Sequence, residues 1–249
     1  MADIEKKDAS AIAAADLFKP KKWGVGAARE RAQQILSELD PKTMPTKLAI
    51  VFDDSGSMGS MNEKGDKSKI EDAKAGIRNF TTQCNPRDTA LAVYPLNVDS
   101  KPLTCNFDLL NLLVASIGPT GGTPLYGKTT EMLQSADTYT RGILFSDGEP
   151  TDELDYEYSD EGQGRIDRKE RMIALALAKK IPLDTVYIGP ADTKGYNVMK
   201  EIADRTGGIF IHFKDSASLS QNLKYLAPAL RGILANAELK AKIERGESI

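Results

Sequence analysis

The stretch Lys47-Leu-Ala-Ile-Val-Phe-Asp53-Asp-Ser55-Gly-Ser57-Met58 decides how this chain folds. Its apolar residues Leu48 to Phe52 form a continuous run of the kind that makes a buried strand. The run ends in a tight, glycine-containing turn with one carboxylate and two hydroxyls in alternate positions. Oxygen donors of this kind suit a hard cation such as Mg²⁺, which prefers octahedral oxygen coordination. The stretch therefore predicts a strand that delivers three oxygen ligands to an open metal site.

Beyond residue 46, apolar runs alternate with helical patterns, which predicts βα units and a mostly parallel sheet covered on both faces. The expected strands are Lys47–Asp53, Thr89–Pro95, Arg141–Ser146, Leu183–Ile188 and Ile209–Phe213, with a short antiparallel edge strand at Pro102–Phe107. The expected helices are Ile70–Gln83, Asp108–Ile117, Pro124–Ala136, Asp167–Lys180, Tyr196–Thr206 and Ser218–Leu234. The fold class is thus α/β, with a six-stranded sheet.

Two further segments offer oxygen donors at the ends of these elements. Gly121-Gly-Thr123-Pro-Leu precedes an expected helix, and Ile143-Leu-Phe-Ser-Asp147-Gly-Glu149-Pro150 ends an expected strand. In open α/β sheets, ligands bind outside the carboxyl ends of the strands, near the point where the strand order reverses. We therefore expect these two loops to meet the turn at Asp53.

Together, the three motifs resemble the von Willebrand factor A (VWA) family and its metal-ion-dependent adhesion site, and the resemblance covers about residues 46 to 226. It implies a Rossmann-like three-layer α/β/α fold. It also implies Mg²⁺ as the bound ion, with Mn²⁺ or Ca²⁺ as alternatives. The implied ligands are Asp53, Ser55, Ser57, Thr123 and Asp147. Asp54 falls at the variable position of the motif and would add a charge beside the metal.

The function implied by this resemblance is that of a metal-dependent protein-binding module. The Asp or Glu carboxylate of a protein partner would complete the coordination of the ion, within an intracellular multiprotein assembly. We expect no enzyme activity, because His212 is the only histidine and lies far in sequence from the three loops. A hydrolytic triad needs a nucleophile with a base in reach.

One alternative function remains open in the same loop. The segment Gly122–Thr129 matches Gly-x4-Gly-Lys-Thr, the pattern of a phosphate-binding loop, and would indicate an NTPase. Such a loop binds phosphate through successive backbone N–H groups. Pro124 lacks that group and instead suits the first position of a helix that continues through Lys128. The VWA-like interpretation is therefore preferred.

Length and composition fit one sizeable domain with extensions. The chain has 249 residues, 41% hydrophobic and 28% charged, and a formal net charge of −3. We expect an N-terminal helical extension at 1–45, the VWA-like domain at 46–228 and a C-terminal helical tail at 229–249. No basic block indicates nucleic acid, and no apolar run reaches the roughly 20 residues that span a membrane. Without a secretory signal, a cytoplasmic location is expected, with Cys84 and Cys105 as free thiols.

Residues 152–161 form an acidic segment directly after the Asp147 loop, with six acids and no base. Such a charge run is typical of a solvated loop. Because it would leave from the metal-bearing face, it is also a candidate for selecting a partner or for binding a second cation.

Overall fold

The computed structural model describes residues 39–62, 65–135, 137–152, 154–159 and 162–214. Apart from Leu39, these residues belong to the unit Asp40–Ile249. The predicted C-terminal tail at 229–249, the helix Ser218–Leu234 and all but residues 39–45 of the N-terminal extension lie outside the described residues. These three predictions therefore stay predictions.

The main sheet has six strands in the order β3-β2-β1-β4-β7-β8. Strands β1 (Thr46–Phe52), β2 (Thr89–Pro95), β4 (Arg141–Ser146), β7 (Leu183–Ile188) and β8 (Phe210–Phe213) run parallel, and β3 (Lys101–Thr104) pairs antiparallel with β2 at the edge. The central strands are buried along nearly their whole length. The predicted six-stranded, mostly parallel sheet with one antiparallel edge strand is confirmed.

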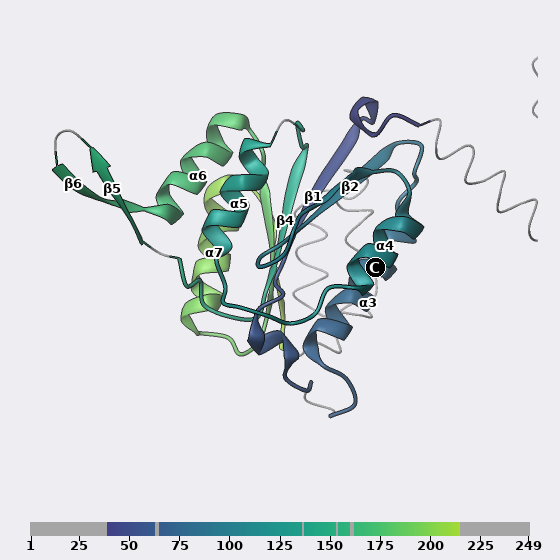
Figure 1. Ribbon diagram of the computed structural model, residues 1–249, viewed down its shortest axis with the longest axis horizontal. Coiled ribbons are helices and arrows are strands. Elements are labelled where there is room, and N and C mark those ends of the chain that lie inside the picture. Colours follow the sequence, from purple (N-terminus) through teal and green to yellow (C-terminus); the bar gives the residue numbers. More distant parts are fainter. Residues whose placement is uncertain (1–38, 63–64, 136, 153, 160–161, 215–249) are drawn as a thin grey trace, which may run out of the picture. The chain divides into compact units, whose positions relative to one another are not determined.

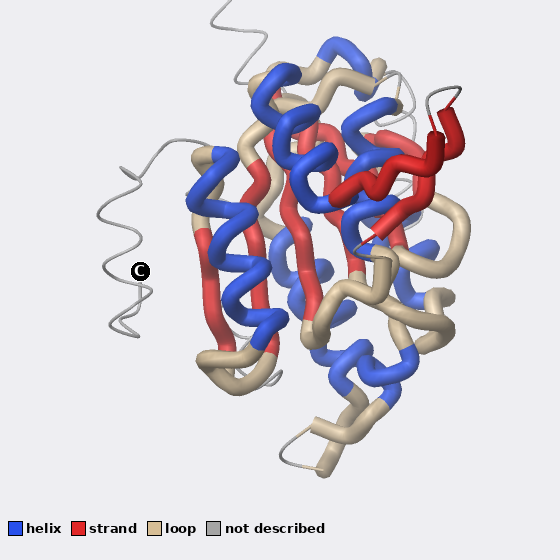
Figure 2. Tube along the Cα trace, turned by 90° about the vertical axis from the view of Figure 1, so that its left-hand side faces the viewer, coloured by secondary structure: helices blue, strands red, loops and turns tan. Residues whose placement is uncertain are grey.

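Five α-helices among the described residues cover the sheet. Helices α3 (Lys69–Thr81) and α4 (Phe107–Ala115) lie on one side of it in Figure 1, and α5 (Leu125–Gln134), α6 (Arg168–Lys179) and α7 (Lys194–Thr206) lie on the other. Figure 2, viewed from the side of α5 to α7, shows helices in front of the strands. Two short 3₁₀ turns, η1 (Pro41–Thr43) and η2 (Gly56–Gly59), precede and follow β1. The three-layer α/β/α arrangement agrees with the prediction.

Alternation along the strands divides the core into two layers. Leu48, Ile50 and Phe52 of β1 belong to one buried cluster, and Ala49 and Val51 belong to the other. Successive side chains of a strand point to opposite faces, so a continuous apolar run satisfies both layers at once. The strand order places β1 between β2 and β4. From β1 the chain adds β2 and β3 on one side of the sheet, and it then returns to the other side of β1 to add β4, β7 and β8. The ends of β1 and β4 therefore form the switch point at which ligands bind in such sheets.

Three predicted segments need correction. The acidic segment, predicted as a solvated loop, lies mostly in an antiparallel hairpin of β5 (Leu154–Ser159) and β6 (Gly162–Asp167), which forms a sheet of its own. Helix α5 begins at Leu125, so Pro124 is the cap residue rather than the first helical residue. The edge strand starts one residue earlier and ends at Thr104, because Asn106 caps α4 by accepting a hydrogen bond from the Leu109 N–H.

Candidate metal centre

The turn after β1 is held in place by backbone hydrogen bonds and by one buried side chain. The Asp53 N–H donates to the Phe145 carbonyl at 3.1 Å, which continues the pairing of β1 with β4 beyond the strand. Met58 is fully buried in the core, and its N–H donates to the Ser55 carbonyl within η2. The turn is held in this position because Met58, which directly follows Ser57, is buried in the core.

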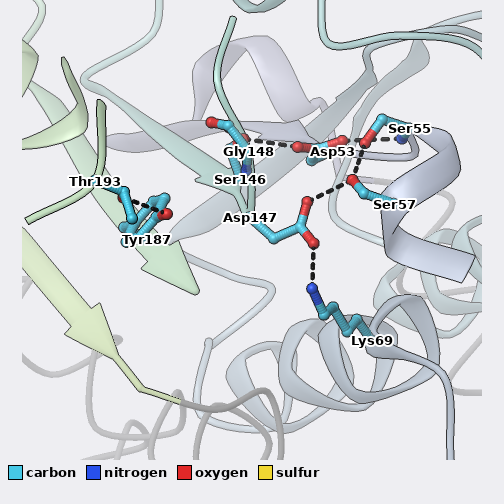
Figure 3. A network of polar contacts seen from close by, with 9 residues as sticks. All are labelled: Asp53, Ser55, Ser57, Lys69, Ser146, Asp147, Gly148, Tyr187 and Thr193. Carbon is cyan, nitrogen blue, oxygen red and sulfur yellow. Dashed lines mark hydrogen bonds and ion pairs between the residues drawn. The ribbon is translucent and has the colours of Figure 1, made fainter. Parts of the chain in front are cut away.

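Four of the five predicted ligands form one hydrogen-bonded chain at this turn (Figure 3). The Ser55 N–H donates to Asp53 Oδ1 at 2.9 Å, and the Ser55 and Ser57 hydroxyls lie 2.9 Å apart. The Ser57 hydroxyl donates to Asp147 Oδ1 at 2.8 Å, across 90 positions of sequence. The structure therefore brings the Asp53 turn and the Asp147 loop together, as the sequence predicted.

The direction of these hydrogen bonds leaves lone pairs on the serine hydroxyls that a cation could use. Because the single proton of Ser57 goes to Asp147, the Ser55 hydroxyl must be the donor to Ser57. A hydroxyl oxygen has two lone pairs. Ser57 therefore keeps one lone pair free in this chain, and Ser55 keeps two. Both hydroxyls retain the capacity to bind a cation without losing their contacts.

Thr123, the fifth predicted ligand, lies beside the Asp147 loop and is not part of the hydrogen-bonded chain of the other four. It is 5% exposed, and a Cβ atom placed on Gly148 would lie 3.8 Å from its hydroxyl oxygen. Its loop is fastened to the Asp147 loop, since the Thr123 N–H donates to the Thr151 hydroxyl at 3.1 Å and the Thr151 N–H donates to the Thr123 carbonyl at 2.9 Å. The hydroxyl is thus next to the Asp147 loop.

The carboxylates of Asp53 and Asp147 lie close enough for the charge of one to affect the other. Burial raises the pKa of the Asp53 carboxyl, the charge of Asp147 raises it further, and hydrogen bonds from Ser146 and Ser55 oppose the shift. Burial disfavours the charged form, whereas a bound cation favours it. Two hard carboxylates and three hydroxyls fit a small divalent ion. Among the described residues, no group of three or more His, Cys, Asp or Glu side chains could hold a metal ion, and the candidate donor set here combines two carboxylates with three hydroxyls.

Three further residues of the site were not predicted from the sequence. The Ser146 hydroxyl donates to Asp53 Oδ2 at 2.6 Å. The Lys69 ammonium lies 2.7 Å from Asp147 Oδ2, as Figure 3 shows. Gly195 of α7 lies so close to the Asp147 loop that a Cβ there would be 2.7 Å from the Gly148 carbonyl oxygen. Only the position of Ser146, at the end of an apolar strand beside Asp147, offered a signal in the sequence.

The Asp54 carboxyl is held by hydrogen bonds from Asn97. It is fully buried, and its Oδ1 accepts hydrogen bonds from the Asn97 backbone N–H at 2.9 Å and from the Asn97 amide at 3.0 Å. The same amide donates to the Gly122 carbonyl at 2.9 Å. Asp54 therefore connects the turn after β1 to the loop that precedes Thr123.

The phosphate-binding pattern at Gly122–Thr129 adopts a different structure from a phosphate loop. Lys128 lies in the first turn of α5 and pairs with Glu131 at 2.9 Å. The backbone N–H groups of Tyr126 and Gly127 donate to the Asp152 carboxylate at 3.3 and 2.6 Å. A carboxylate thus already takes the donors that a phosphate would need at this helix start.

The single histidine, the two cysteines and Glu149 lie in ordinary structural surroundings. His212 bonds through Nε2 to the Gly189 carbonyl at 2.7 Å, as expected for a structural histidine. Cys84 and Cys105 are not joined in a disulfide, which confirms the prediction of two thiols. Glu149 lies 3.6 Å from Lys194 at the surface, with both side chains more than half exposed. None of the helices in the described ranges is long and apolar enough to cross a membrane.

Comparison with solved structures shows the fold of VWA-type domains. The chain resembles a von Willebrand factor type A protein from Catenulispora acidiphila (16% identity, TM-score 0.58), covering 76% of this chain and 43% of that one. It resembles BatB from Bacteroides thetaiotaomicron with 16% identity and a TM-score of 0.54, over 75% of this chain and 99% of that one. It also resembles the vWF domain of the type V pili tip protein Mfa5 from Porphyromonas gingivalis with 14% identity and a TM-score of 0.56, over 78% of this chain and 97% of that one. No family model and no curated protein matches the chain.

Proposed function

We propose that this chain is a protein-recognition module that binds Mg²⁺ through Asp53, Ser55, Ser57, Thr123 and Asp147. The ion would then coordinate an Asp or Glu carboxylate of a protein partner. The observation that carries the proposal is the chain of hydrogen bonds from Asp53 through Ser55 and Ser57 to Asp147 at the sheet's switch point. The likeness to a pilus tip domain also supports recognition of another protein.

The donor set explains why recognition is preferred over catalysis. Hydroxyls are neutral ligands, so two carboxylates balance the ion's charge without exceeding it, and five protein donors leave one octahedral position open for a further oxygen. Metal-assisted hydrolysis would also need a positioned base or a second ion. The surface pair Glu149 and Lys194 offers neither, because both side chains are solvated. A cytoplasmic location and a role within a larger assembly are part of the proposal.

The metal site is tested by titrating the full chain with MgCl₂ in a calorimeter. A Ser55→Ala/Ser57→Ala double variant keeps both carboxylates and removes only two neutral ligands. We expect one saturable Mg²⁺ site in the wild type and none in the double variant. Ser60→Ala, an exposed hydroxyl three residues beyond Ser57, is the matched control and should bind like the wild type. Equal binding by all three proteins would exclude the proposed ligands.

The recognition step is tested by capturing partners on the immobilised chain in Mg²⁺ and again in a chelator. A partner recognised through the ion is lost in the chelator and is not captured by the double variant. Replacing each Asp or Glu of that partner with Asn or Gln should then identify the coordinating carboxylate. A partner that stays bound in the chelator shows that recognition does not use the metal.

A further inference from the structure

Lys69 has an unusual place at the start of α3. It is the first residue of the helix, directly after the Ser68 cap, and its N–H donates to the Ser60 carbonyl at 3.0 Å. The N-terminus of a helix carries a partial positive charge and favours acidic side chains there. Glu71 and Asp72 meet that preference in the same turn. A lysine at this position is therefore not explained by the helix.

The lysine is explained by the carboxylate that it reaches. Its ammonium lies 2.7 Å from Asp147 Oδ2, and the Asp147 side chain is only 1% exposed. The other oxygen of the same carboxylate accepts the proton of Ser57. Figure 3 shows Lys69 pointing from α3 to Asp147, away from its own helix. Both oxygens of Asp147 are thus engaged, one by a hydroxyl of the turn and one by a cation of the protein itself.

This contact has a consequence for any second cation at the site. Two positive charges near one carboxylate repel each other, and the repulsion is stronger where burial lowers the effective dielectric constant. The Lys69 side chain is 24% exposed, so water screens it only in part. A divalent ion that uses Asp147 must bind against the lysine charge or displace the ammonium.

We propose that Lys69 is a built-in counter-cation that holds Asp147 in the metal-free protein and weakens divalent-ion binding. The inference rests on the proposed function and adds a control of metal affinity to it. In the metal-free state the ammonium neutralises one of the two ligand carboxylates and keeps the Asp147 loop against α3. Metal occupancy then depends on competition between the ion and the lysine, which gives the site a lower affinity than its oxygen donors alone would provide.

The test is Lys69→Met, which removes the charge and keeps an unbranched side chain only one atom shorter. Titration of the full chain with MgCl₂ at constant ionic strength should show binding about tenfold tighter than in the wild type, because one of two nearby like charges is gone. Lys69→Arg keeps the charge and should bind like the wild type. Lys69→Gln serves as a second neutral variant if the methionine variant does not fold.

A matched control removes an equivalent lysine elsewhere. The Lys169 ammonium also lies 2.7 Å from a carboxylate, Glu201, and its side chain is 22% exposed, yet the pair joins α6 and α7. Lys169→Met should leave Mg²⁺ affinity unchanged. The two neutral Lys69 variants should also lose stability in a chelator, since Asp147 then has no counter-ion, and should gain more from Mg²⁺ than the wild type does.

The outcomes distinguish a failure of the role proposed for Lys69 from a failure of the proposed function. If the wild type binds Mg²⁺ and the neutral Lys69 variants bind equally or more weakly, the inference is wrong and the proposed function stands. If no protein binds Mg²⁺, both are wrong. If only the neutral variants bind, Lys69 excludes the ion from the wild type, so the proposed function is wrong for the wild-type chain although the lysine does oppose the metal.

Discussion

Asp54 and Asn97 position the loop before Thr123, although neither is one of the ligands proposed for the metal. The Asn97 amide joins Asp54 Oδ1 to the Gly122 carbonyl, and the Thr120 N–H donates to the Asp54 carbonyl. Gly121 has φ +65°, and a Cβ there would lie 2.3 Å from the Asn97 side-chain oxygen. The backbone of the loop is thus fitted closely around one amide.

We predict that Asn97→Ala lowers both stability and metal affinity. It removes two side-chain hydrogen bonds and leaves the buried Asp54 with fewer donors, so the free energy of unfolding should fall by about 1–3 kcal/mol. Mg²⁺ affinity should fall as well, because Thr123 is no longer held beside Gly148. Urea unfolding and calorimetry measure the two effects. Asn85→Ala, in an exposed turn, is the control; a loss of stability with unchanged affinity would show that the network does not position the ligand.

The two cysteines should differ in reactivity. Burial raises the pKa of the Cys105 thiol, and the nearby charge of Asp40 raises it further. Because the thiolate is the reactive form, a raised pKa leaves less of it near neutral pH. Cys84 is only half-buried. Iodoacetamide at pH 8 should therefore alkylate Cys84 several times faster than Cys105, as followed by peptide mass spectrometry. Equal rates would mean that the helix α4 region opens readily.

At the scale of elements, α5 depends on a cap that comes from far along the chain. Pro124 offers no side-chain hydrogen bond at the helix start. The Asp152 carboxylate caps the helix instead, because it accepts hydrogen bonds from the N–H groups of Tyr126 and Gly127. Asp152→Ala should therefore cost about 1–2 kcal/mol of unfolding free energy. Asp204→Ala, which breaks only an exposed pair with Lys200, should cost less than about 1 kcal/mol. Urea unfolding compares them, and equal losses would contradict the capping role.

The hairpin of β5 and β6 shows how an element can be missed in the sequence. Six acids without a base indicated a solvated loop, whereas Leu154, Tyr156 and Tyr158 alternate with acids in the two-residue period of a strand. The partner strand lies outside the acidic segment, with Arg165 in register with Tyr156. For this segment the two-residue periodicity is a better indicator of structure than the charge composition.

For the molecule as a whole, the sheet and most of the candidate site were predictable, but the contacts that organise the site were not. Continuous apolar runs mark strands buried on both faces, and the order of the loops places Asp53 and Asp147 at one edge. Lys69, Asn97 and Asp152 contact residues that are 78, 43 and 25 or 26 positions away. Side chains joined over such distances carry no local pattern, so only the fold reveals them.

Mg²⁺ binding should stabilise the whole chain against heat. An ion that binds only the folded state at a concentration of 100 Kd stabilises it by about 2.7 kcal/mol, which raises the midpoint of a chain this size by roughly 5–10 °C. Asp53→Asn should lose this shift. Since burial raises the pKa of Asp53, its charge is unfavourable in the metal-free protein, and the neutral variant should be at least as stable as the wild type in a chelator. Thermal unfolding by circular dichroism measures both midpoints, with NaCl of equal ionic strength as the control. A Mg²⁺ shift that persists in Asp53→Asn would place the ion elsewhere.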